Sequence, residues 1–404
     1  MLKLPATYLL AAAFITSLIF TLDPNQAGFG LYEFAIFKYL PIILGNLSAL
    51  LFLLSCGPNC FGMTPSMLII FAAYVLGGSL YTTFVIGHDP MDSFLGRGLA
   101  IFTFFAAFRV NTYLPAINIF NQLILKLLPR IGLLIAFGIY IWALGYHFVN
   151  QPHVYHTQVI IPLSSVVILY MQSRVNSLYK IMMIIILLFS GLALYKNTGI
   201  IGTISIFILL LYLLLKQPRK IADYKIIAIL VNLMAFSSIL LLITIFMSFS
   251  WLELYAYLPS GSTAVRLNTY AERFTMISEN PFFGEYFVGS PLMTLPTIEG
   301  DLVIPSHSDI LDIIAFGGVV GLALFIIPVL KGIKSCSFII NSPYRINRTA
   351  ALWSLVYVTL NLINFGFNAT WIRPEMSTLF MISLGLLLGF HSQHGAKKMR
   401  DKIK

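Results

Sequence analysis

Charged side chains are scarce in this chain of 404 residues: aspartate, glutamate, lysine and arginine make up 10% of it, whereas 58% of the residues are hydrophobic. Soluble globular domains carry about 25% charged residues. The scarcity of charge therefore excludes a soluble globular protein and indicates an integral membrane protein.

Long apolar runs of about 17 to 25 residues recur along the chain, each long enough to cross roughly 30 Å of hydrocarbon as a helix. We predict twelve spans: 6–22, 30–54, 62–86, 95–109, 130–149, 157–172, 178–195, 199–215, 225–247, 308–330, 350–367 and 376–391. The expected fold is all-α, a polytopic membrane protein of about twelve transmembrane helices. Most connections are short and no internal repeat is found, so residues 1–404 are expected to form a single transmembrane domain.

The basic residues predict how these spans are oriented. With the N-terminus in the cytoplasm, nineteen of the 25 lysines and arginines fall on cytoplasmic segments, and six lie near or beyond the outer ends of spans: Lys38, Arg97, Lys196, Arg266, Arg273 and Arg373. Both termini are then cytoplasmic. The net charge of +10 is explained by a basic rim facing anionic lipid, with no nucleic-acid partner. The apolar N-terminus also fits a cleaved signal peptide, but counting it as the first span completes the topology.

Candidate metal ligands are few. Cys56, Cys60 and Cys336 all map to predicted cytoplasmic turns, where thiols stay reduced. The CGPNC motif at 56–60 has no second cysteine or histidine pair nearby and is typical of an ordinary turn. The PHVYH motif at 152–156 lacks carboxylate or thiol partners. No metal site is predicted.

Two connecting segments stand apart from the rest. Residues 110–129 have apolar residues at helical spacing and are expected to lie along the inner surface as an amphipathic helix. Residues 248–306 form by far the longest loop, which the topology places outside. Long loops in compact proteins are usually functional or disordered. Aromatic-rich stretches and a helical pattern predict that this one is ordered and partly helical.

The sequence GSTAVRLNTYAERFTMISENP within this loop predicts a capped helix that Asn280 and Pro281 end. Arg266 and Arg273 are seven residues apart and so project from one face, with Tyr270 between them. The loop as a whole is acidic, with two arginines against six carboxylates. The arginines are therefore either ion-paired structural residues or an anion-binding site, and the residues alone leave both readings open.

The stretch IPSHSDILDIIAFGGVVG at 304–321 places His307 just before the tenth predicted span. Asp309 and Asp312 lie in the first turns of that span, where carboxylates complement the helix dipole. This does not explain His307, whose imidazole titrates near neutral pH and can act as a general base. Opposite two arginines, such a base indicates transfer chemistry on an anionic, lipid-linked substrate. The glycines of the stretch are expected to be close-packing points between helices.

The tract from Arg266 to Gly321 resembles the signature of the O-antigen ligase and polymerase superfamily, membrane glycosyltransferases of the GT-C type. The signature has an arginine opening an outer-loop helix, an asparagine-proline-x-x-glycine turn, and a histidine followed by a leucine and two glycines. The matching residues are Arg266, Asn280, Pro281, Gly284, His307, Leu311, Gly318 and Gly321. The twelve-span layout with a large outer loop extends the likeness to most of the chain.

The resemblance implies an enzyme of the bacterial inner membrane with a periplasmic active site on loop 248–306. Such enzymes transfer a glycan from undecaprenyl diphosphate to an acceptor hydroxyl and are expected to need no metal or other cofactor. By this likeness, Arg266 would bind the donor diphosphate and His307 would deprotonate the acceptor. Further substrate-binding candidates are Arg273, Lys196, Arg373, Asp309 and Tyr270. Lys196 stands where family members tend to carry an arginine, and it lacks the bidentate fork that suits phosphate.

Two reactions fit this likeness. A polymerase adds the growing glycan to another lipid-linked repeat unit, giving O-antigen, capsule or exopolysaccharide, with a chain-length regulator as a candidate partner. A ligase transfers the glycan to the lipid A core. The SHSDIL motif favours the polymerase, and the ligase stays an alternative. A polysaccharide or lipid-glycan transporter is a second alternative, but the centres of the spans carry almost no charge, whereas transporters usually place ionisable residues at mid-membrane.

Overall fold

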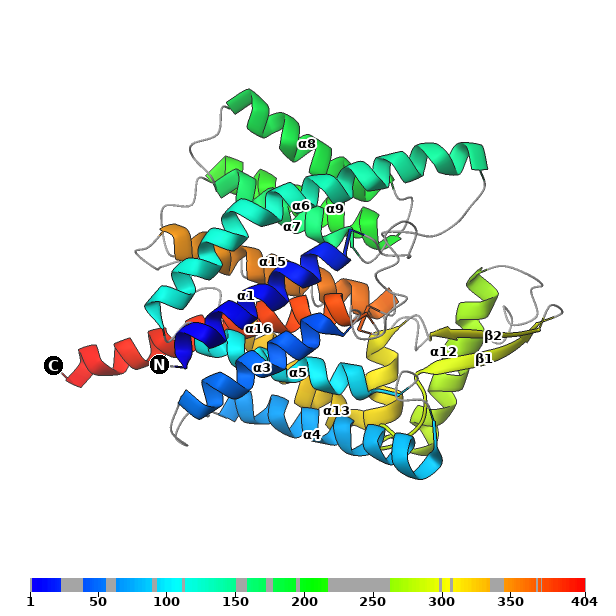
Figure 1. The fold of residues 1–404 in the computed structure, drawn as a ribbon. Coiled ribbons are helices and arrows are strands. Elements are labelled where there is room, and N and C mark those ends of the chain that lie inside the picture. Colours follow the sequence, from blue (N-terminus) through cyan, green and yellow to red (C-terminus); the bar gives the residue numbers. More distant parts are fainter. Residues whose placement is uncertain are drawn as a thin grey trace.

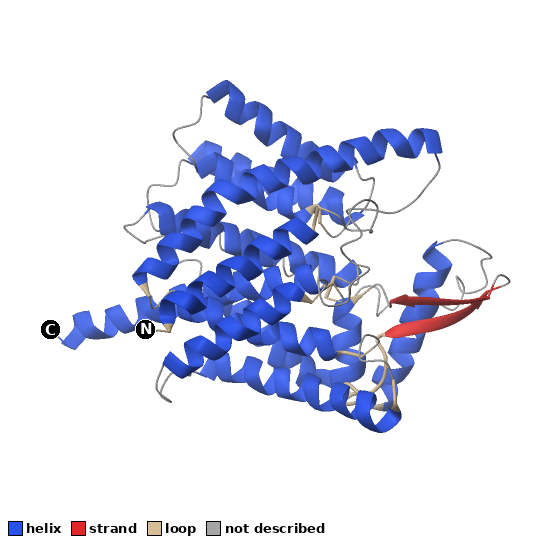
Figure 2. Cartoon of the chain, in the orientation of Figure 1, coloured by secondary structure: helices blue, strands red, loops and turns tan. Residues whose placement is uncertain are grey.

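The computed structural model of this chain describes residues 2–22, 39–55, 63–88, 93–110, 113–149, 158–171, 177–193, 197–216, 262–297, 300–305, 308–334, 345–367, 370–371 and 373–403. Helices make up most of these segments, and one two-stranded hairpin stands at the edge of the helical body (Figure 2). The helical architecture predicted from composition is therefore confirmed, while the hairpin was not predicted.

The elements follow one another along the chain with these bounds: α1 (Lys3–Phe20), α3 (Leu40–Ser55), α4 (Met63–Tyr81), the π-helical turn η2 (Thr82–Ile86), α5 (Leu95–Val110), α6 (Leu114–Val149), α7 (Ile160–Met171), α8 (Ser177–Ala193), α9 (Asn197–Lys216), α12 (Ser262–Glu279), β1 (Leu292–Thr297), β2 (Gly300–Pro305), α13 (Asp309–Lys334), α15 (Arg345–Phe367) and α16 (Pro374–Ile403). Eleven of the twelve predicted spans overlap these helices, and the ninth, 225–247, lies outside the described residues, as do residues 30–38 of the second.

Length and composition allow four described stretches to cross a bilayer: Lys3–Phe20, Met63–Ile86, Pro115–Ile141 and Asp309–Lys334. Shorter apolar helices of 10–17 residues accompany them in the described segments. The chain is therefore a membrane protein with transmembrane helices. The count of twelve crossings and the placement of loop 248–306 outside stay predictions.

Large apolar side chains also cover the outside of the helical body. Phe84 is 79% exposed, Ile141 71% and Leu178 68%. Exposing such a side chain to water costs about 1.5–3 kcal/mol relative to burying it. Lipid tails are as apolar as these side chains and accept them without that cost, so the exposed apolar surface fits a protein that lies in a membrane.

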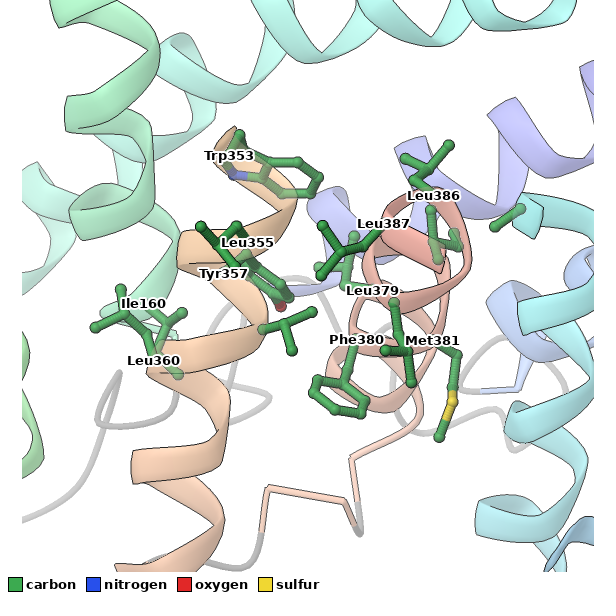
Figure 3. Packing of buried hydrophobic residues seen from close by; sticks show 14 of the residues in the cluster. Ile160, Trp353, Leu355, Tyr357, Leu360, Leu379, Phe380, Met381, Leu386 and Leu387 are labelled. Atoms are coloured by element: carbon green, nitrogen blue, oxygen red, sulfur yellow. The ribbon is translucent and has the colours of Figure 1, made fainter. Parts of the chain in front are cut away.

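Large buried side chains fill the space between α15 and α16. Trp353 and Tyr357 of α15, and Leu379 and Phe380 of α16, lie between the two helices, and all four are fully buried (Figure 3). The indole Nε1 of Trp353 donates to Ser164 Oγ of α7 at 3.1 Å, which satisfies its polar atom. This packing holds the beginning of α16 in a fixed place within the bundle.

The segment 110–129 differs from its prediction. It does not form a separate helix, because from Leu114 it continues through Pro129 into the next span as the 36-residue helix α6. A proline inside a helix removes one backbone hydrogen bond, which apolar transmembrane helices tolerate when neighbouring groups compensate. The stretch long enough to span, Pro115–Ile141, begins inside this segment. The predicted boundary between a surface helix and a span is therefore wrong, while the placement of residues 110–129 along the inner surface stays a prediction.

The two chain ends lie at one end of the helical body, and α12 with the hairpin lies at the opposite end (Figure 1). This separation agrees with the predicted topology, although the side of the membrane that each faces stays a prediction. In the hairpin, β1 and β2 pair antiparallel, with Leu292 opposite Pro305 and Thr297 opposite Gly300. Both strands are edge strands, which is where a sheet tolerates a proline such as Pro296.

Candidate active site

Helix α13, the predicted tenth span, is broken at Gly318, whose φ of 61° and ψ of −167° are not helical. Figure 1 shows its two parts at an angle to each other. A break leaves carbonyls at the end of the first part and amides at the start of the second without helical partners. The backbone of residues 280–287, NPFFGEYF, supplies the missing hydrogen-bond partners. Four hydrogen bonds join this turn to the break: Val319 N to Pro281 O (2.9 Å), Val320 N to Phe282 O (3.1 Å), Glu285 N to Ala315 O (3.2 Å) and Phe287 N to Phe316 O (2.8 Å).

Two glycines of the signature make this joint possible. A methyl group on Gly318 would collide with the Phe282 carbonyl, and its positive φ suits only glycine. A methyl group on Gly284, where φ is 58°, would lie 2.6 Å from the carbonyl carbon of Phe316 and 2.7 Å from the amide nitrogen of Gly318. The expectation of close packing at Gly318 is therefore right about the approach, but a turn approaches here rather than a helix.

Aromatic packing fixes the turn against the neighbouring helices. Phe287 is fully buried, and its ring centroid lies 5.8 Å from Phe71, 5.2 Å from Tyr74 and 5.3 Å from Phe94. Edge-to-face pairs at these separations stabilise beyond the area that they bury. The Tyr74 hydroxyl also donates to the Phe283 carbonyl. The turn thereby ties α13 to α4 and to the residues that precede α5.

Asp312, in the first turn of α13, bridges two arginines from different helices. Its Oδ1 accepts from Nε of Arg273 on α12 at 3.0 Å, and its Oδ2 accepts from Nη1 of Arg97 on α5 at 3.4 Å. All three side chains are at most 3% exposed. Buried ion pairs stabilise only when hydrogen bonds satisfy their remaining polar atoms. Arg273 meets this condition, because Nη1 contacts Glu272 at 3.4 Å and Nη2 donates to the Pro291 carbonyl at 3.1 Å.

Aromatic rings cover both guanidinium groups. The Cζ of Arg273 lies 4.8 Å from the ring centroid of Phe316, and that of Arg97 lies 4.7 Å from Phe94 and 5.9 Å from Trp371. The rings of Phe94 and Phe316 touch each other with centroids 4.7 Å apart. Cation–π attraction at buried sites holds such groups in one orientation. The two arginines are therefore fixed on adjoining rings.

Asp309 opens α13 but binds another segment. Its Oδ2 accepts from the amides of Thr370 at 2.6 Å and Trp371 at 2.7 Å, just before α16. We expected this carboxylate to complement the dipole of its own helix and to bind substrate. The structure instead shows one of its two oxygens occupied by the start of the α16 segment, and its Oδ1 without a hydrogen-bond partner among the described residues.

These contacts gather three helix N-termini. Arg97 is the third residue of α5, Asp312 is the fourth of α13, and their ion pair joins the two helices. Asp309 joins α13 to Trp371, three residues before Pro374 begins α16. Helix N-termini carry partial positive charge and free amides, and both favour anions. Buried carboxylates of the chain already lie in the first turns of two of these helices: Asp309 and Asp312 on α13, and Glu375 on α16.

The structure describes four of the seven predicted site residues with their side chains. Tyr270 is 7% exposed on α12, close to Arg273, while Arg373 is partly exposed and donates its amide to Thr370 O at 3.1 Å. The structure brings Arg273, Asp309 and Arg373 to the same group of helix ends. The remaining three are Arg266, which lies on the predicted helix with its side chain outside the described set, and His307 and Lys196, which lie outside the described residues.

The site also contains two residues that were not predicted as members, Arg97 and Asp312. Arg97 could have been noticed as one of the six basic residues at outer ends, and Asp312 as a carboxylate one turn after Asp309. Within the described segments, no group of three or more histidines, cysteines or acidic residues is arranged to hold a metal. The prediction of a metal-independent reaction is not tested by this observation.

Comparison with known proteins finds a family likeness for part of the chain. No curated protein matches the chain. A family model described as O-antigen ligase matches residues 182–326. The matched segment contains α12, the hairpin, the turn and the break in α13, whereas Arg97 and Arg373 come from outside it. Residues 182–326 are therefore similar to the O-antigen ligase family, which confirms the predicted resemblance to the O-antigen polymerase and ligase superfamily.

Proposed function

We propose that this protein is a glycosyltransferase that polymerises undecaprenyl-diphosphate-linked oligosaccharide repeat units at the periplasmic face of the bacterial inner membrane. One observation carries the proposal: the segment that matches the O-antigen ligase family also brings Arg273, Asp312 and the start of α13 together. A function of the O-antigen polymerase or ligase type follows from the family. The donor, the residue roles and the choice of polymerase are the proposed part.

The leaving group of this reaction is a diphosphate, which gains negative charge as the glycosidic bond breaks. Positive groups fixed in advance at that place lower the barrier. Arg266 lies seven residues from Arg273 on α12, about 10 Å along the axis and on the same face. All three nitrogens of Arg273 already have protein partners. In the proposal, Arg266 therefore binds the diphosphate, with Arg373 and Lys196 as further cations, while Arg273 mainly holds α12 in place.

His307 is the proposed general base. In the sequence it stands between Pro305, where β2 ends, and Asp309, where α13 begins. The acceptor hydroxyl oxygen forms a bond to the anomeric carbon of the donor sugar, and its proton passes to His307. The bond from that carbon to the diphosphate breaks, and its electron pair leaves with undecaprenyl diphosphate. Asp309, held by the segment before α16, keeps the start of α13 in position for this step.

The proposed function is tested by His307→Ala in cells that depend on this protein for their surface glycan. We expect normal membrane levels of the variant but no long glycan chains on an electrophoretic ladder. The matched control is His88→Ala, since His88 is an exposed histidine after η2 and has no proposed role. Arg266→Ala should behave like His307→Ala, and Arg266→Lys should keep part of the activity. A normal ladder from the His307 variant would exclude the general-base role.

Ligation to the lipid A core is the second candidate, because the matching family model is described as O-antigen ligase. Purified protein in liposomes separates the two reactions. With lipid-linked repeat units alone, a polymerase produces longer glycans that remain on the lipid carrier, whereas a ligase produces nothing until lipid A core is added. A product that requires the core would replace the polymerase proposal by the ligase.

A further inference from the structure

Arg97 is deeply buried, and most of its hydrogen-bond donors lack a partner among the described residues. It is 3% exposed, yet its Nε and Nη2 have no hydrogen-bond partner in the described part of the chain. Its described polar contact is the 3.4 Å bond from Nη1 to Asp312. A guanidinium carries five N–H donors, and each buried donor left unpaired costs about 1–3 kcal/mol, more on a charged group. These donors require an acceptor that the described protein groups do not supply.

The comparison with Arg273 shows that this is a feature of one arginine and not of the site. Both arginines pair with Asp312 and both lie against aromatic rings. Arg273 uses all of its nitrogens for protein partners. Arg97 uses one, and its Nε and Nη2 together form one edge of the planar group, the geometry that binds two oxygens of a phosphate. Arg273 is arranged as a structural residue, and Arg97 as a ligand-binding residue.

A small cavity lies beside Arg97. Its volume is about 20 Å³, and Arg97, Gly96, Trp371, Pro374 and Ser377 are among the residues that line it. Such a volume admits one water molecule or one oxygen of a larger group. Gly96 belongs to the first turn of α5, and Pro374 and Ser377 belong to the first turn of α16. Two positive helix ends therefore flank the cavity.

The positive charge of Arg97 is less compensated than that of Arg273. The two arginines share Asp312, and Arg273 also contacts Glu272 at 3.4 Å. One oxygen of the neighbouring Asp309 is already bound by two backbone amides. A water molecule in the cavity would accept one or two hydrogen bonds but leave this charge in place. A phosphoryl oxygen would accept the same hydrogen bonds and also neutralise the charge.

We propose that Arg97 binds a phosphate-type oxyanion, with one of its oxygens entering the cavity between the first turns of α5 and α16. The identity of that oxyanion as the diphosphate of the glycan donor rests on the proposed function. A phospholipid headgroup presents the same chemistry. Arg97 comes from outside the segment that matches the family model, so this site adds an anion ligand from α5 to the α12–α13 region.

The test is calorimetric titration of the full-length protein in neutral detergent with inorganic pyrophosphate, and separately with short-chain phosphatidylglycerol. The variants are Arg97→Gln, Arg97→Lys and the matched control Arg109→Gln, which changes an arginine in the last turn of the same helix. A hydrogen bond to a charged group is worth about tenfold or more in affinity. We expect at least that loss for Arg97→Gln, a smaller loss for Arg97→Lys, and wild-type affinity for the control.

Loss of pyrophosphate binding assigns the site to a diphosphate, and loss confined to phosphatidylglycerol assigns it to a lipid headgroup. Equal affinities of wild type and Arg97→Gln for both ligands, or no binding by the wild type, overturn the proposal. If Arg97→Gln unfolds, as judged by its Tm without ligand, Arg97→Lys decides the question. If wild-type protein in liposomes makes no longer glycans from lipid-linked repeat units while Arg97→Gln loses pyrophosphate binding, the proposed function alone is rejected. If longer glycans form and Arg97→Gln binds as well as wild type, this site alone is rejected.

Discussion

Replacing Gly318 by alanine tests the joint between the turn 280–287 and the broken helix α13. Its φ of 61° and ψ of −167° fall in a region that glycine alone occupies readily, and holding another residue there costs about 1–3 kcal/mol. The added methyl would also collide with the Phe282 carbonyl and lie 2.5 Å from the Phe283 nitrogen. The turn must then move, which weakens the two hydrogen bonds from Val319 and Val320, each worth about 0.5–1.5 kcal/mol.

These contributions predict that Gly318→Ala lowers the free energy of unfolding by about 2–6 kcal/mol, a large part of the 5–15 kcal/mol typical of a native protein. Gly321→Ala is the matched control, because the nearest atoms to its added methyl lie 3.5 Å away, at ordinary contact distance. Alanine also favours a helix by about 1 kcal/mol over glycine. The control should therefore be unchanged or slightly more stable.

The assay is unfolding of the purified variants in mixed micelles of a neutral detergent and dodecyl sulfate. Tryptophan fluorescence is a suitable signal, since Trp371 lies in the site and its ring is 5.7 Å from that of Phe71. The midpoints of wild type and both variants are compared at the same total detergent concentration. A Gly318→Ala midpoint that coincides with that of Gly321→Ala would refute the view that the turn holds the break.

Two further predictions concern the carboxylates. Asp312→Asn should lower the free energy of unfolding by about 3–5 kcal/mol, because it leaves two buried arginines without their shared counter-charge. The double variant with Arg273→Met should lose less stability than the sum of the two single variants. Purely additive losses would contradict the ion pair. Asp309→Asn should cost about 1–3 kcal/mol by weakening the charge-assisted bonds from Thr370 and Trp371. Hydrogen exchange of those two amides should become faster, and unchanged exchange rates would exclude their hydrogen bonds to Asp309.

Elements that depend on local sequence were predictable. The apolar runs gave the helices because their length and composition suffice for a helix in lipid, whatever the partners. The end of α12 at Glu279 was also predictable, since Asn280 and Pro281 cannot easily continue a helix. The same turn residues were recognised as a family signature. Their physical role is to hydrogen-bond to the backbone at the break in α13. That role depends on two segments together and could not be predicted from the sequence of the turn or of α13 alone.

Features that depend on contacts between residues far apart in the sequence were not predicted. Arg97 and Asp312 are 215 positions apart, and nothing local to either residue indicates the pair. The break at Gly318 lies inside an apolar run, which by composition predicts an unbroken span. In α6, the predicted surface helix 110–129 and span 130–149 form one continuous helix. In each case the tertiary contact, rather than the local preference, determines the outcome.

The break also explains how the proposed catalytic residues could be held in register. The turn fixes the first part of α13, and Asp312 fixes α12 through Arg273. In the chain, Arg266 lies on α12 and His307 lies two residues before α13. Misplacement of a reacting group by about 1 Å can cost a hundredfold in rate. A change in the turn can therefore abolish transfer without touching a reacting group. It follows that loss of activity assigns a chemical role only where stability is retained, which for this site means variants of His307 and Arg266 measured beside their unfolding midpoints.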